Sequence, residues 1–211
     1  MKAVNPEIAG YLEREILPRY DAFDKAHGRD HALYVMEQSR YLGGFYDVDP
    51  DILAVAAACH DLGLCVCRET HHLESGKIIR SDKNLRRWFN EDQIETIARA
   101  AEDHRASLDH EPRDIYGKII AEADRQIDTR TVIRRTIQYS LNHYPGFSKQ
   151  EHWERTVAHL EEKYADGGYL KLWIPESPNA ERLHALQLLI KDRTRIKELV
   201  EQVYDEEEKN R

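Results

Sequence analysis

The sequence predicts an all-α protein in which helices follow one another along the whole chain. Apolar residues recur at helical spacing, as at Ile8, Leu12 and Ile16. Helix-start signals precede several such segments, as at Asn5-Pro6 and Asp49-Pro50. No stretch alternates apolar and polar residues over the length of a strand. Together these observations favour a helical bundle.

The first three helices are expected before residue 63. One begins at Asn5-Pro6. A second runs from about residue 30 to 42 and ends at Gly43-Gly44. The third begins at Asp49-Pro50 and carries "DILAVAAACHDL", the most apolar segment of the chain. Such a segment needs burial on all sides, so we expect this helix at the centre of the bundle.

The later helices alternate with short polar loops. Asn90 with Gln93, and Ser148 with Glu151, resemble capping boxes. Helices are expected over 72–89, 91–106, 112–127, 129–144, 149–168 and from 178 to the charged tail, with 169–178 as an irregular connector. We predict that residues 1–211 form a single domain. Its core would span about 20–130, and 131–211 would supply accessory helices packed on that core.

Composition narrows the class of protein. The chain has 211 residues, of which 41% are hydrophobic and 33% charged, as in soluble globular domains. A net charge of −8 disfavours a nucleic-acid polymer as partner, but it is compatible with a small phosphorylated substrate if a metal supplies positive charge.

The longest apolar run, "ILAVAAAC", is too short to span a membrane, and acidic residues interrupt the first sixteen residues. Three clustered cysteines favour a reducing cytoplasm, and the oligomeric state is left open.

The stretch "ACHDLGLCVCRETHH", residues 58–72, offers two alternative metal sites. Zinc could bind Cys65, Cys67, His71 and His72. Alternatively, the pair His60-Asp61 binds the metal and the cysteines have no part. The C-x-C spacing is shorter than that of structural zinc sites, and Cys59 lies in an apolar helix. We therefore favour histidine and aspartate, with the cysteine site as the minority interpretation.

A further candidate metal ligand lies in the helix expected over 112–127. Asp124 is an acid in an otherwise apolar segment, and a buried carboxylate needs a partner, which a metal would provide. Adjacent helical residues point about 100° apart, so His60 and Asp61 can reach one ion only where the helix ends. Gly63 is well placed to end it.

The order of these motifs resembles the HD superfamily of metal-dependent phosphohydrolases. "HGRDHALYV", "ACHDLG" and "EADR" look like three of its motifs and nominate His31, His60, Asp61 and Asp124 as metal ligands. "HHLESGKII" and "AEDHRAS" are similar to the two histidine motifs of members that hold two metals. They nominate His72, which His71 could replace, and His104. The resemblance covers roughly residues 20 to 130.

The resemblance implies a metal-dependent phosphohydrolase that acts on a nucleotide or another small phosphate ester. One or two divalent ions are expected: Mn, Fe, Mg, Co, Ni or Zn. Asp61 would be both ligand and proton acceptor, and Lys77 and Arg105 would contact phosphate. Two alternatives remain: a di-iron oxygenase with the same ligands, and a metal-stabilised binding module without catalytic activity.

Overall fold

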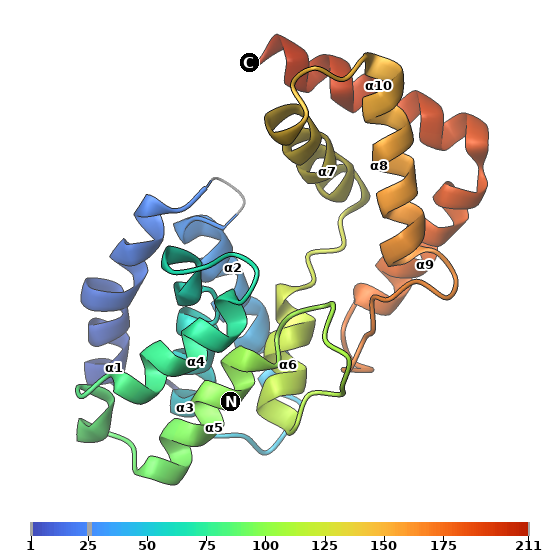
Figure 1. The fold of residues 1–211 in the computed structure, drawn as a ribbon. Coiled ribbons are helices and arrows are strands. Elements are labelled where there is room, and N and C mark those ends of the chain that lie inside the picture. Colours follow the sequence, from blue (N-terminus) through green and yellow to red (C-terminus); the bar gives the residue numbers. More distant parts are fainter. Residues whose placement is uncertain (1, 25–26, 211) are drawn as a thin grey trace. The chain divides into compact units, whose positions relative to one another are not determined.

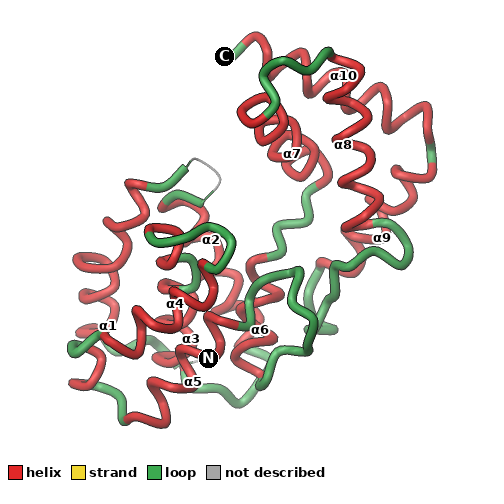
Figure 2. The backbone as a smooth tube through the Cα atoms, in the orientation of Figure 1, coloured by secondary structure: helices red, strands yellow, loops and turns green. Residues whose placement is uncertain are grey.

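The protein is all-α, as predicted (Figure 1 and Figure 2). A computed structural model describes residues 2–24 and 27–210, and within these ranges it contains ten α-helices and no strand. Among the described helices, none has both the length and the apolar composition needed to cross a bilayer.

The chain divides into two compact units. The first comprises the residues up to Arg125 together with the short segment Trp173–Ser177. The second comprises Gln126–Leu172 and the residues from Pro178 onward. The division at Arg125 lies close to the predicted end of the core at about residue 130. The single-domain expectation, with 131–211 packed on the core, stays a prediction.

The first unit contains six α-helices around a shared apolar core. The cluster of buried side chains draws residues from every one of these helices and from Ile174. The helices are α1 (Pro6–Tyr11), α2 (Arg29–Gly43), α3 (Pro50–Cys59), α4 (His71–Ser81), α5 (Glu91–Glu102) and α6 (Ile115–Asp124). After α1 the chain continues through the π-helical residues Leu12–Ile16 and the 3-10 residues Leu17–Ala22.

Helix α3 is the central helix of this unit. It packs against α2, α5 and α6, and most of its residues are buried, including the run Val55–Cys59. Alanines predominate in that run, so neighbouring helices can approach closely on several sides. The position expected from the apolar sequence is therefore observed.

The structure shows the helix-capping hydrogen bonds that the sequence predicted. The side chains of Asn5 and Asp49 accept backbone hydrogen bonds at the starts of α1 and α3. Asn90 and Gln93 form a reciprocal capping box at α5. Each device satisfies amide groups that a helix start would otherwise leave without partners.

Two predicted helices are interrupted. The segment 72–89 is not one helix, because α4 ends at Ser81 and Asp82 adopts an extended backbone before the 3-10 turn Leu85–Arg87. The helix expected from residue 178 to the tail is two helices, because the Asp192 side chain accepts from the amide of Arg195 and starts a new helix there. In both places a short aspartate competes with the helical backbone hydrogen bonds.

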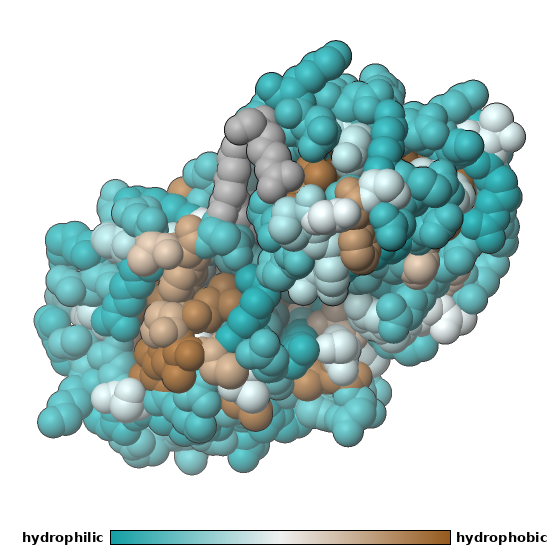
Figure 3. All heavy atoms as spheres, turned by 45° about the horizontal axis from the view of Figure 1, so that its top comes forward, coloured by the Kyte–Doolittle hydropathy of each residue, from teal (hydrophilic) through white to brown (hydrophobic). Residues whose placement is uncertain are grey.

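The second unit consists of four helices. Helices α7 (Thr129–His143), α8 (Lys149–Tyr164) and α10 (Arg193–Lys209) pack against one another, and α9 (Asn179–Lys191) packs against α8 and α10. Ser148 and Glu151 form the predicted capping box at α8. Charged side chains dominate the exposed faces, and hydrophilic residues cover most of the surface visible in Figure 3.

Candidate metal centre

Six histidine and aspartate side chains of the first unit gather at helix ends. Helix α2 supplies one from its first turn, and α4 supplies another from its first residue. The others lie just after α3 and α5 or at the last residue of α6. They are His31, His60, Asp61, His71, His104 and Asp124.

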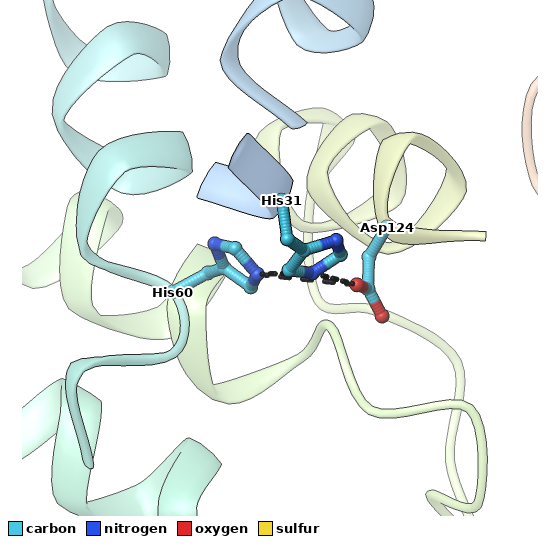
Figure 4. A group of neighbouring side chains, drawn as sticks. All are labelled: His31, His60 and Asp124. Carbon is cyan, nitrogen blue, oxygen red and sulfur yellow. Dashed lines mark hydrogen bonds and ion pairs between the residues drawn. The ribbon is translucent and has the colours of Figure 1, made fainter. Parts of the chain in front are cut away.

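His31, His60 and Asp124 form the first of two groups, with ligand atoms all within 4.8 Å of one another. His31 Nε2 lies 3.1 Å from Asp124 Oδ1 and 3.4 Å from His60 Nε2. Figure 4 shows the two imidazole rings and the carboxylate converging from α2, from the turn after α3 and from the end of α6. His31 and His60 are buried, and the Asp124 side chain is 25% exposed. One edge of the group is therefore open to solvent.

Asp61, His71 and His104 form the second group. The Nε2 atoms of His71 and His104 lie 3.1 Å apart, and each is 3.4 Å from Asp61 Oδ1. Three donor atoms thus face a common point, as a metal ion requires.

Asp61 connects the two groups. Its Oδ1 faces His71 and His104, whereas its Oδ2 lies 3.4 Å from His60 Nε2 and 3.7 Å from His31 Nε2. The carboxylate is almost fully buried, at 2% exposed. A carboxylate with one oxygen in each group can bridge two cations.

Backbone carbonyls determine which histidine nitrogen is free. The Nδ1 atoms of His60, His71 and His104 lie 2.7, 2.7 and 2.6 Å from the carbonyl oxygens of Ala57, Arg68 and Ala101. A carbonyl oxygen can only accept, so each Nδ1 must carry the hydrogen. In the neutral rings, Nε2 then presents a lone pair to the centre of its group.

This arrangement fits a divalent metal ion. The Nε2 atoms of His71 and His104 lie 3.1 Å apart, so two lone pairs there would repel each other unless a proton or a metal ion lies between them. Imidazole nitrogens and carboxylate oxygens are also the donors that several divalent transition metals prefer. These two groups could therefore hold one or two divalent ions, whose identity the donors do not determine.

The charges within the site also favour the binding of a cation. Burial disfavours the charged form of His60, but the nearby carboxylates of Asp61 and Asp124 outweigh this and raise its pKa to about 9. For Asp61, burial acts to raise the pKa, but His60 and His104 lower it well below its ordinary value. Burial, with a contribution from His104, lowers the pKa of His71 to about 4, so its ring is neutral at pH 7. The carboxylates of Asp61 and Asp124 therefore attract positive charge, and the neutral His71 ring can bind a metal ion.

The close packing of α4 against the turn after Asp61 brings His71 into the site. Gly63 donates its amide to Ser75 Oγ at 2.8 Å. A Cβ atom on Gly63 would lie only 2.0 Å from the His71 carbonyl oxygen. Helix α3 ends at Cys59, so His60 and Asp61 lie at a helix end as predicted, and Gly63 also allows this close approach.

The structure brings His71, and not the nominated His72, into the second group. His72 is buried at 7% exposed, and its Nδ1 has no hydrogen-bond partner. Adjacent residues on a helix point in different directions, so a double histidine gives no sequence signal for which ring enters a site. A role for His72 as a ligand stays a prediction.

The remaining nominated residues lie outside both groups. Lys77 is exposed and pairs with Glu74 at 2.7 Å. Arg105 is half-buried and donates to the backbone carbonyl of Glu69. Their roles as phosphate contacts stay predictions.

None of the cysteines belongs to either group among the described residues. Cys59 is buried in α3, Cys65 is exposed, and Cys67 lies 3.2 Å from a Glu69 carboxylate oxygen. The alternative zinc site of Cys65, Cys67, His71 and His72 is therefore not assembled.

Fold and site together define a helical domain whose helix ends present a buried cluster of histidines and aspartates. Residues 28–126 match the family model of the HD domain, and the predicted resemblance is confirmed. HD domains bind divalent metals, and the family consists mostly of hydrolases. No curated protein and no solved structure matches the chain.

Proposed function

We propose that the protein is a metal-dependent phosphohydrolase that acts on a nucleotide or another small phosphate ester. The observation that carries this proposal is the placement of Asp61 between two groups of nitrogen and oxygen donors. The match to the HD domain supports hydrolase chemistry of this general kind.

A bound divalent ion would supply a Lewis acid that lowers the pKa of water and polarises a phosphoryl oxygen. The first group would hold one ion and the second group another, with Asp61 shared between them. The backbone bonds to Nδ1 of His60, His71 and His104 would keep the three rings oriented before any ion arrives. Asp61 would also accept a proton from the attacking water. In this proposal Lys77 and Arg105 orient the phosphate.

Elemental analysis of protein purified without added metal, followed by a phosphatase screen with each divalent ion, tests the proposal. We expect two ions per chain and hydrolysis of at least one phosphate ester. Asp61→Ala should lower hydrolysis by about 100-fold or more, because it removes a shared ligand and a proton acceptor together. Cys65→Ser is the matched control and should retain metal and activity.

The histidine pair tests the second ion separately. His71→Ala should reduce the metal content from two ions to one, whereas His72→Ala should leave it at two. A wild-type chain with a single tightly held ion would contradict the two-ion arrangement. Iron content with a redox-sensitive spectrum and no hydrolysis would instead indicate the oxygenase, and bound metal without any turnover would indicate the binding module.

A further inference from the structure

Tyr20 contacts the His60–Asp61 turn from outside the matched HD segment. It lies in the 3-10 residues Leu17–Ala22, whereas the match covers residues 28–126. The side chain is fully buried, at 0% exposed. Its hydroxyl donates to the Ala58 carbonyl at 2.8 Å and accepts from the Asp61 amide at 3.3 Å.

These two bonds lie where helix α3 ends. A helix end leaves carbonyls without helical partners, and two of them here find side chains. The Ala57 carbonyl accepts from His60 Nδ1, and the Ala58 carbonyl accepts from Tyr20. The Tyr20 hydroxyl thus joins the last turn of α3 to the first residue that leaves it.

The backbone of Asp61 leaves the helical conformation at this point. Its φ of −105° and ψ of 5° lie in the sparsely populated bridge region, whereas His60 is still helical at −56° and −37°. Continued helix would point the two side chains about 100° apart. The change at Asp61 allows both to face the same histidines, so a bond to the Asp61 amide acts on the orientation of the bridging carboxylate.

Metal ligands tolerate little displacement, about 0.5 Å or 10–20° from the productive geometry. Asp61 is sensitive to such changes because its two oxygens face different groups. We propose that Tyr20 is a positioning residue for the metal centre, acting through the Asp61 amide and the Ala58 carbonyl. This inference rests on the proposed metal binding.

A second buried tyrosine provides a matched control. Tyr11 lies in α1, is 6% exposed, and donates its hydroxyl to the Asp82 carboxylate, which belongs to neither donor group. Tyr20→Phe and Tyr11→Phe each remove one buried hydroxyl from the same N-terminal segment. Both should lower the thermal stability, but only the first should alter the metal centre.

Titration of the full-length protein with Co²⁺, followed by visible absorption, tests the proposal. Tyr20→Phe should weaken Co²⁺ binding by about 10-fold and change the shape of the d–d bands, because the ligand geometry has changed. Tyr11→Phe should bind Co²⁺ with the affinity and the spectrum of the wild type. Circular dichroism of both variants should show native helix content.

Each other outcome overturns the inference. If both variants bind Co²⁺ like the wild type, Tyr20 has no positioning role, although the proposed function still stands. Loss of helix content in Tyr20→Phe alone would show a general structural role instead. A wild-type chain that binds no Co²⁺ and no other divalent ion would overturn both proposals.

Discussion

At the scale of single residues, the partner of one ring nitrogen decides whether a histidine is ready to bind a metal. His60, His71 and His104 each donate Nδ1–H to a carbonyl three residues earlier, which directs Nε2 toward the Asp61 carboxylate. His143 also bonds a carbonyl, that of Tyr139, but it is exposed and belongs to neither donor group. The chemical type of the residue is the same, and only its surroundings make it a candidate ligand.

The three thiols should differ sharply in reactivity. Burial raises the pKa of the Cys59 thiol to about 12, so little of the reactive thiolate exists at neutral pH and reagents cannot reach it. Cys65 is exposed and Cys67 is partly exposed. Titration with a disulfide reagent at pH 8 should count two thiols in the native protein and the third only after unfolding.

The control for this count is Cys59→Ser. It should leave the native count at two and reduce the denatured count to two. Three rapidly reacting thiols in the folded wild type would contradict the burial of Cys59.

At the scale of elements, the site depends on where helices end. The turn after α3 and the start of α4 meet at Gly63, whose amide bonds Ser75. Helices α4 and α5 are joined further by the Arg80 guanidinium, which pairs with Glu95 and Glu102. Because His71 begins α4 and His104 follows α5, this packing determines the distance between the two histidines.

Gly63→Ala should therefore disturb the second group. Its Cβ would overlap the His71 carbonyl and the Ser75 amide, so α4 must move. We expect a loss of about 1–3 kcal/mol in the free energy of unfolding, as for overpacking elsewhere, together with weaker binding of one of two ions. Gly146→Ala is the control, because a Cβ there meets nothing within 4 Å. If Gly63→Ala and Gly146→Ala have the same free energy of unfolding and the same metal affinity, the close contact at Gly63 is contradicted.

The Arg80–Glu95 pair should make stability depend on acidic pH. The Arg80 hydrogen bonds lower the pKa of Glu95 from 4.5 to about 2. A depressed folded-state pKa means that the pair stabilises the fold above pH 4.5, and that this contribution is lost as the pH falls toward 2. The difference in melting temperature between wild type and Glu95→Gln should therefore be larger at pH 6 than at pH 3.

If the difference in melting temperature between wild type and Glu95→Gln stays constant from pH 6 to pH 3, the stabilising role of the Arg80–Glu95 pair is contradicted.

At the scale of the whole molecule, the chain leaves the first unit at Arg125 and later returns to it. The segment Trp173–Ser177 belongs to the first unit although the second unit surrounds it in sequence. Trp173 donates its amide to Glu122 at 2.8 Å, and Tyr46 donates its hydroxyl to Glu176 at 2.6 Å. Ile174 is buried in the apolar core at 3% exposed.

Ile174→Ala should therefore destabilise the first unit. Truncation of a buried isoleucine leaves a cavity and costs about 2–5 kcal/mol in the free energy of unfolding. Leu188→Ala, at a position 55% exposed in α9, should cost less than about 0.5 kcal/mol. Urea unfolding of both variants measures the difference, and similar midpoints would show that the segment is not packed in the core.

The sequence by itself determined the helical class, the central position of α3, the helix caps and the residue types of the candidate site. These features depend on local spacing and local hydrogen bonds, which are readable along one segment. Tertiary structure decided that His71 enters the second group, that Asp61 faces both groups, and that Tyr20 supports the turn between them. It also decided that 173–177 returns to the first unit. Those outcomes depend on the direction of each side chain and on contacts between distant segments, and no local pattern encodes either.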